Sequence, residues 1–135
     1  MGNRVTPPVM GAGDWTCAKP EHWLFEGTGM KKGDSIEGLV GWEWHGAPMM
    51  DLPGMQIVAE GETFMTGGKN PGHYTATVYD GPKGNIVFNA ATIWWANGLS
   101  SPPGHVNPSR HGVAQQGVDE RVQRITHNLF QRMIS

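Results

Sequence analysis

A chain of 135 residues has room for one domain with its own core but not for two. Its net charge of −2 and its ten scattered lysines and arginines exclude a nucleic-acid-binding surface, and no apolar run is long enough to cross a bilayer. The single cysteine, Cys17, cannot form an internal disulfide, which favours the cytoplasm.

Prolines and glycines dominate the first part of the chain, and no periodic pattern survives them. We therefore expect residues 1–20 to form an extended N-terminal arm, and residues 21–135 to form a single small domain. The run of apolar residues after Lys31–Asp34 predicts a strand from about Leu39 to His45. A compact strand is predicted over Met55–Glu60, followed by a loop over Glu62–Pro71.

The stretch from Gly72 to Gly98 carries the clearest local pattern. Alternation over His73–Tyr79 predicts a half-buried strand with Tyr74, Ala76 and Val78 on one side. The Gly81–Gly84 turn then leads into Asn85–Thr92, which is nearly all apolar or small and is expected to be the more buried arm. The sequence therefore predicts a β-hairpin, followed by the bulky Ile93, Trp94 and Trp95.

Beyond the hairpin, Leu99–Gly117 has three prolines and no periodicity, so we expect a long loop. The last element is an amphipathic helix whose apolar side chains should cover the sheet. These residues recur at helical spacing: Val118, Val122, Ile125, Leu129 and Met133.

Three segments together resemble a known family. They are Asp14–Gly46, Gly81–Ser100 and Arg121–Met133. The chain is similar to the C-terminal region of the large-subunit family of N,N-dimethylformamidase. That resemblance implies an α/β or α+β fold, a partial glutamine-amidotransferase-like sheet with a β-hairpin and a closing C-terminal helix.

The same resemblance implies hydrolysis of amide or formamide C–N bonds by the full-length enzymes, which hold a mononuclear iron with Tyr, His and Glu. Those chains are several times longer, and no stretch here matches their metal-binding segment. We therefore carry over no iron ligand and expect no cofactor in this chain. The chain is expected to be a C-terminal or accessory domain, or else a non-catalytic assembly or ligand-binding module.

Two His and Glu pairs are the candidate catalytic or metal-binding residues. Glu43 and His45 lie two apart and would share one side of a strand, and His22 and Glu26 would share one side of a helix. A third ligand such as His73 or Tyr74 would have to arrive through folding. The alternative is that these polar residues only satisfy strand ends and loops.

Other motifs favour ordinary structural roles. Cys17 lacks the sharp turn of a nucleophilic thiol, and the Gly27–Gly33 stretch does not match a phosphate-binding loop. Trp42, Trp44, Trp94 and Trp95 fit core or interface positions better than a sugar-binding groove. Because a single helix cannot cover both faces of a sheet, we expect a homo-oligomer or a subunit of a larger enzyme.

Overall fold

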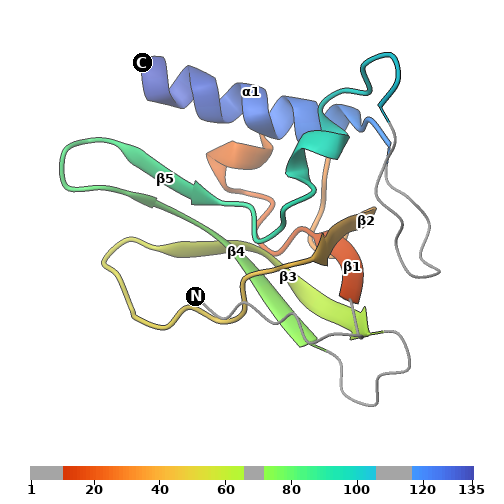
Figure 1. Cartoon of the computed structure of the whole chain (residues 1–135). Helices are drawn as coiled ribbons and strands as arrows, with labels where there is room; N and C mark the ends of the chain where they lie inside the picture. The colour runs from red at the N-terminus through yellow and green to blue at the C-terminus, as the bar shows by residue number, and fades with distance from the viewer. Residues whose placement is uncertain (1–10, 66–71, 106–116) are drawn as a thin grey trace.

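The computed structural model describes residues 11–65, 72–105 and 117–135. It shows a curled five-stranded sheet in the order β2-β1-β3-β4-β5, with α1 lying across one side of it (Figure 1). The strands are β1 (Gly11–Thr16), β2 (Ser35–Trp42), β3 (Gln56–Met65), β4 (Gly72–Asp80) and β5 (Ile86–Asn89). The helices are the 3₁₀ turns η1 (Trp23–Phe25) and η2 (Trp95–Gly98) and the helix α1 (Glu120–Ile134).

All of the strand pairs in this sheet are antiparallel. The architecture is therefore β-rich with one covering helix, and the expectation of an α/β fold with a partial glutamine-amidotransferase-like sheet does not describe it. The physical reason is the connections, because parallel neighbours need a crossover of a dozen or more residues, usually a helix. The one α-helix in the described part of the chain comes only after the last strand.

The predicted β-hairpin and its turn are confirmed. β4 pairs with β5 from Thr77↔Asn89 to Asp80↔Ile86, and Gly84 has the positive φ of 74° that the turn requires. The prediction that the second arm is the more buried one is wrong. β5 is an edge strand and its residues are only half-buried, whereas Tyr74 through Val78 of β4 are all buried.

The segment expected to be an N-terminal arm contributes β1, which lies between β2 and β3 inside the sheet. Residues 1–10 lie outside the described residues. The prolines and glycines did not reveal this strand pairing, because Gly13 serves a close approach of two strands: a Cβ there would lie 2.5 Å from the carbonyl oxygen of Glu62.

Two other strand boundaries differ from the prediction. The strand expected over Leu39–His45 begins earlier, at Ser35, and ends at Trp42, after which Glu43 and Trp44 make only isolated bridges. The strand expected over Met55–Glu60 continues to Met65 because its second half pairs with the start of β4. Most of the loops predicted over Glu62–Pro71 and Leu99–Gly117 therefore fall either in β3 or in residues 66–71 and 106–116, outside the described residues.

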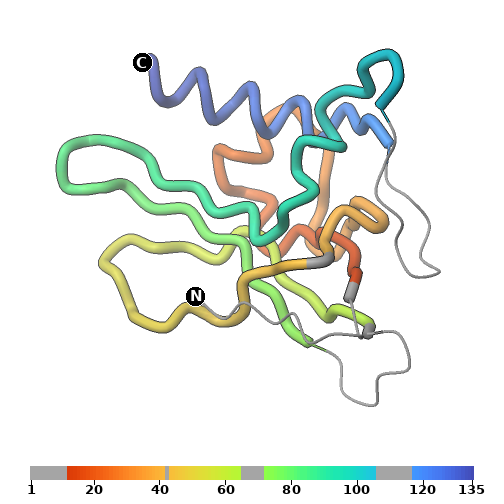
Figure 2. The backbone as a smooth tube through the Cα atoms, in the orientation of Figure 1, coloured from red at the N-terminus to blue at the C-terminus, as the bar shows by residue number. Residues whose placement is uncertain are grey.

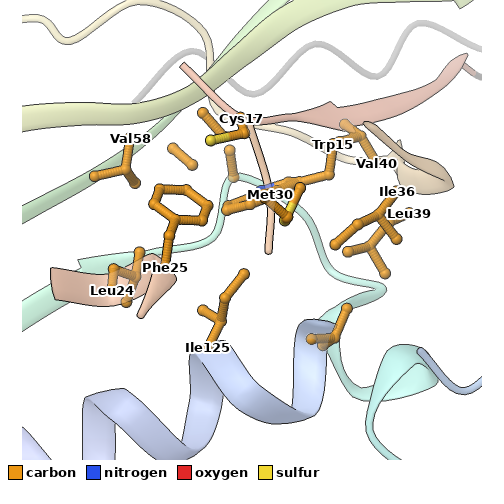
Figure 3. Close-up of a cluster of buried hydrophobic side chains, with 14 of the residues drawn as sticks. Trp15, Cys17, Leu24, Phe25, Met30, Ile36, Leu39, Val40, Val58 and Ile125 are labelled. Atoms are coloured by element: carbon orange, nitrogen blue, oxygen red, sulfur yellow. The ribbon is translucent and has the colours of Figure 1, made fainter. Parts of the chain in front are cut away.

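The core lies between the sheet and the layer formed by η1, η2 and α1. Trp15 of β1 is fully buried at its centre, packs edge-on against Trp95 and donates its indole N–H to the carbonyl oxygen of Ala90, at 3.0 Å. Figure 3 shows Trp15, Leu24 and Phe25 facing Ile125 of α1. These hydrophobic side chains form one cluster that includes Cys17, Ile36, Leu39, Val40, Val58, Val122 and Leu129.

The predicted helix is confirmed, with Asp119 as its N-cap. Its apolar stripe is shorter than expected, because Val118 and Met133 are about half exposed while Val122, Ile125 and Leu129 are buried. In the described part of the chain, no helix is long and apolar enough to span a membrane.

We predict that Gly41→Ala destabilises the protein by about 1–3 kcal/mol, as overpacking of a filled core does. A Cβ at Gly41 would lie 2.1 Å from the ring of Trp94, which is buried. Urea unfolding measures the effect. Gly117→Ala is the matched control, because a Cβ there meets no atom of the described residues within 4 Å, and it should change stability by less than about 0.5 kcal/mol.

The N-cap residue of α1, Asp119, should contribute to the loss of unfolding free energy at low pH. Hydrogen bonds from Arg121 hold the pKa of the Asp119 carboxyl below its ordinary 3.8. A depressed pKa stabilises the fold above the unfolded-state pKa, and this contribution is lost as the pH falls through the folded-state pKa.

Asp119→Asn should therefore remove part of the loss in unfolding free energy between about pH 5 and pH 2, while the asparagine still caps the helix. Urea unfolding at both ends of that range measures it. Glu120→Gln, a change at the exposed carboxylate next to it, is the control. An unchanged pH dependence in Asp119→Asn would contradict the assignment.

Candidate functional site

The side of the sheet that faces away from α1 carries a cavity of about 330 Å³, which we call the outer-face cavity. It exists because residues alternate along β4: Tyr74, Ala76 and Val78 belong to the core cluster, so Thr75, Thr77 and Tyr79 face the opposite side. Figure 2 shows the β2–β3 connection and the β4–β5 hairpin projecting to the same side of the molecule. The cavity lies between these two segments.

His45 is held in place at the edge of this cavity by three contacts. Its backbone N–H donates to the carbonyl oxygen of Ala91, at 3.2 Å, and its carbonyl oxygen accepts from the N–H of Thr75, at 2.9 Å. Its ring Nδ1 is hydrogen-bonded to the side-chain Nδ2 of Asn89. Both the position and the orientation of the imidazole are therefore fixed by neighbouring segments of the fold.

The Asn89 amide determines the tautomer of His45. Asn89 Oδ1 accepts the N–H of Ala91, at 2.9 Å, so its Nδ2 is the atom that faces the imidazole. An amide N–H can only donate, which makes Nδ1 of His45 an acceptor and leaves the ring proton on Nε2. The pair therefore presents a neutral imidazole with an N–H donor at Nε2.

Ala91 has an unusual backbone conformation at this point. Among the described residues it is the one non-glycine residue with a positive φ, at 62°, and its side chain is buried. Left-handed backbone costs an alanine roughly 1 kcal/mol, and such residues concentrate near functional sites. Here the conformation lets Ala91 bond Asn89 with its N–H and His45 with its carbonyl oxygen.

The hydroxyl groups that line the outer-face cavity differ in whether another group of the protein hydrogen-bonds them. Thr75 Oγ1 donates to the carbonyl oxygen of Gly46, at 2.6 Å, and so fixes the start of the β2–β3 connection. The hydroxyls of Thr77 and Tyr79 make no hydrogen bond to any described residue, although Thr77 is only 8% exposed. The apolar walls come from Met49, Met50, Leu52, Met55 and Val87.

The structure brings Glu43 and His45 to one smaller cavity, of about 100 Å³, on the other side of the His45–Asn89 pair. Glu43 is exposed, and it and Trp44 form isolated bridges with Gly41 and Thr92. The predicted pair thus lines a common cavity, although its role stays a prediction.

The structure does not place His22 and Glu26 on one side of a helix, as the sequence predicted. His22 is buried and its Nδ1 accepts the N–H of Leu24 as the N-cap of η1, and burial lowers the pKa of the ring. Glu26 is exposed at the end of η1. Because η1 has only three residues, it does not provide the four-residue spacing on a helix that the prediction required.

The structure also places the proposed third ligands. His73 is exposed and lies 3.5 Å from a carboxylate oxygen of Glu60. Tyr74 is buried, and its hydroxyl donates to the carbonyl oxygen of Asp14 at 2.6 Å while it accepts the N–H of Thr16. Neither residue lines either cavity at His45.

An iron site made of Tyr, His and Glu does not fit the described residues. The Tyr74 oxygen is occupied by backbone contacts, and burial raises the pKa of its hydroxyl to about 12. Tyr79 and His45 share the outer-face cavity, but no carboxylate of the described residues lines it. Within residues 11–65, 72–105 and 117–135, no group of three or more His, Cys, Asp or Glu side chains could hold a metal ion.

The remaining motifs take structural positions. Cys17 is buried in the core, where desolvation raises the pKa of its thiol. Trp44 and Trp94 are buried, and Trp95 is half-buried with its indole N–H donating to Thr126 Oγ1 of α1. Trp44, Trp94 and Trp95 therefore contribute to the core, in agreement with the predicted core or interface positions, while the side chain of Trp42 lies outside the described part of the structure.

Sequence reasoning missed Asn89, Thr77 and Tyr79. The alternation over His73–Tyr79 already separated Thr77 and Tyr79 from the core side of the strand, so a signal for them existed. Nothing local marked Asn89, because its partners His45 and Ala91 meet only through the fold.

Comparison with known protein families identified a match. A family model described as N,N-dimethylformamidase beta subunit-like, C-terminal, matches residues 1–111. No curated protein and no solved structure matches the chain.

The Asn89 amide should control the imidazole tautomer, which ¹⁵N NMR of the histidine side chains can read directly. In the wild type the neutral ring of His45 should carry its proton on Nε2. Asn89→Asp replaces the donor with a carboxylate oxygen, so the proton should move to Nδ1. The ring of His73, which is exposed, is an internal control and should not change. An Nδ1–H tautomer in the wild type would contradict the geometry.

Proposed function

The chain belongs to the N,N-dimethylformamidase beta subunit-like, C-terminal family, and we propose that it is an accessory domain of a formamidase-like hydrolase of C–N amide bonds. In this proposal the domain is not catalytic on its own. Another segment or chain supplies the reacting centre, and this domain contributes a binding wall and a contact surface.

The single observation that carries the proposal is the family match over residues 1–111. The geometry of the site agrees with it. His45 and Asn89 form a rigid neutral pair suited to orienting a neutral polar group, and the cavity beside them is lined by hydroxyls and thioethers. Amide hydrolysis needs an activated water or nucleophile in addition, which the proposal assigns to the other segment.

A contact surface for such a segment lies next to the outer-face cavity. Met49 is 80% exposed and Met50 is 66% exposed, and both adjoin Ile57 of β3 in a shallow depression. Exposed apolar residues that are contiguous are typical of protein–protein contacts, where methionine is enriched. We propose that this surface, Met49, Met50 and Ile57, packs against the remainder of the enzyme.

The other features that the resemblance implied would lie elsewhere in the enzyme. The iron and its Tyr, His and Glu ligands would belong to the segment that this domain contacts, and so would the glutamine-amidotransferase-like domain. The free, buried Cys17 is consistent with a reducing compartment, and we place the enzyme in the cytoplasm.

A different apolar surface supports the alternative, a non-catalytic module that forms a homo-oligomer. At the C-terminal end of α1, Phe130, Met133 and Ile134 are 61%, 50% and 78% exposed. Residues three and four apart share one face of a helix, so these side chains form one patch. A second copy of the chain could cover it.

The test is an assay of the purified chain with N,N-dimethylformamide. We expect no release of dimethylamine and no stoichiometric iron by elemental analysis, because the reacting centre lies elsewhere. Release of amine by the isolated chain, with iron bound, would overturn the accessory role. Light scattering on the same sample then reports the state of assembly against the monomer mass of 14.7 kDa.

Two charge variants separate the accessory role from the alternative. If the end of α1 is a self-association surface, Phe130→Glu should dissociate a defined oligomer while Met49→Glu leaves it intact. If the surface beside the cavity is the contact, Met49→Glu should reduce association and Phe130→Glu should not. Both positions are exposed, so each variant should fold.

A further inference from the structure

The outer-face cavity has the size and lining of a small-molecule site. Its volume of about 330 Å³ falls within the range typical of ligand pockets. One wall is the outward side of β4 and β5, which the sheet makes rigid, and the facing wall is the connection between β2 and β3. A rigid polar wall thus faces an apolar one.

The polar wall presents hydrogen-bonding groups that the protein does not use itself. The hydroxyls of Thr77 and Tyr79 have no partner among the described residues, and Thr77 is largely removed from solvent. Neither hydroxyl is among the fully buried, unpartnered side-chain atoms of the described residues, so both are open to the cavity, where a ligand atom can take the place of water as their hydrogen-bond partner. His45, whose ring carries its N–H at Nε2, lines the same cavity.

The charge of the lining restricts the ligand further. Among the described residues, no lysine, arginine, aspartate or glutamate lines the outer-face cavity, and His45 Nδ1 can accept the Asn89 N–H only when the imidazole is neutral. An ionised ligand would lose its hydration without gaining an opposite charge, which is strongly unfavourable. The cavity therefore selects against anions and cations.

The apolar wall can pack against the apolar part of ligands that differ in shape. Met49, Met50 and Met55 contribute flexible thioether side chains, and Leu52 completes this wall, while Val87 of β5 adds apolar surface on the side of the strands. Methionine adapts to irregular partners and contacts aromatic rings favourably. An aromatic or branched aliphatic body would therefore pack there.

We propose that the outer-face cavity binds a small neutral molecule with an apolar body and one hydroxyl or carbonyl group, which is bonded by Thr77 and Tyr79. This inference does not rest on the accessory role proposed above. It concerns binding by the chain itself, and it holds or fails whether or not the chain belongs to an active hydrolase.

The test uses three probes of nearly equal shape: 4-methylphenol, toluene and 4-methylbenzoate. Methyl NMR of the methionine side chains follows binding to the full chain. We expect 4-methylphenol to shift the signals of Met49, Met50 and Met55 with a Kd on the order of 1 mM. The signals of Met30, buried in the core, and of Met133, exposed on α1, should not move.

The other probes test the polar and charge requirements separately. Toluene should bind about threefold to tenfold more weakly, because it lacks the hydroxyl. 4-Methylbenzoate should not bind, because no positively charged residue in the described part of the chain lines the cavity to compensate its charge. Equal binding of all three probes, or equal shifts at Met133, would show non-specific apolar contact and overturn the proposal.

Variants then assign the site. Thr77→Val together with Tyr79→Phe keeps the size of both side chains and should abolish the preference for 4-methylphenol over toluene. Thr28→Val, which removes a hydroxyl beside α1, should retain it. Val87→Trp on the edge strand should block all binding by filling the cavity. Urea unfolding of each variant confirms folding, and an unchanged preference in the folded double variant would refute the proposal.

Discussion

The architecture depends on the contacts of one buried tyrosine with the first strand. Tyr74 of β4 donates its hydroxyl to the carbonyl oxygen of Asp14 and accepts the N–H of Thr16, at 2.6 and 2.7 Å. β1 bulges between Gly13 and Trp15, where the register with β2 shifts, and the Asp14 carboxylate accepts the N–H of Gly38 on the other side. A bulge frees backbone groups that must find partners, and Tyr74 supplies them from two strands away.

The bulge explains how Trp15 reaches the centre of the core, because an extra residue bends the strand and redirects its side chain. From there its indole bonds Ala90, just before the left-handed Ala91. The same strand that holds Tyr74 continues to Thr75, whose N–H holds the carbonyl oxygen of His45. Core and site are thus coupled through adjacent residues that point to opposite faces of β4.

Patterns of period two and 3.6 predicted the elements that pair or pack locally, namely the β4–β5 hairpin and α1. The position of β1 within the sheet could not be predicted from the sequence. Gly13 of β1 allows a close approach to β3 and does not form a loop, and this is evident only when the neighbouring strands are known. Antiparallel pairing was equally hidden, since it depends on which strands are neighbours. At the site, the sequence indicated His45 but not Asn89. Asn89 lies 44 residues away in the sequence and reaches the His45 ring only in the folded protein.

The two faces of the sheet are covered by different parts of the chain, and each cover is attached by different hydrogen bonds. On the helical face, Asn128 of α1 bonds the carbonyl oxygens of Leu24 and Glu26, and Trp95 bonds Thr126, so the layer is fastened by side chains as well as by packing. On the outer face, the Thr75 hydroxyl fastens the start of the connection from Gly46 to Gly54 by its hydrogen bond to the carbonyl oxygen of Gly46.

Exposed Met49 and Met50 lie beyond that point. Substitutions in this connection can therefore change the shape of the cavity while the sheet backbone still holds His45 and the two hydroxyls. The hydroxyls proposed to bind the polar group of the ligand thus lie on β4, whereas most of the side chains that would contact its apolar body lie in the β2–β3 connection.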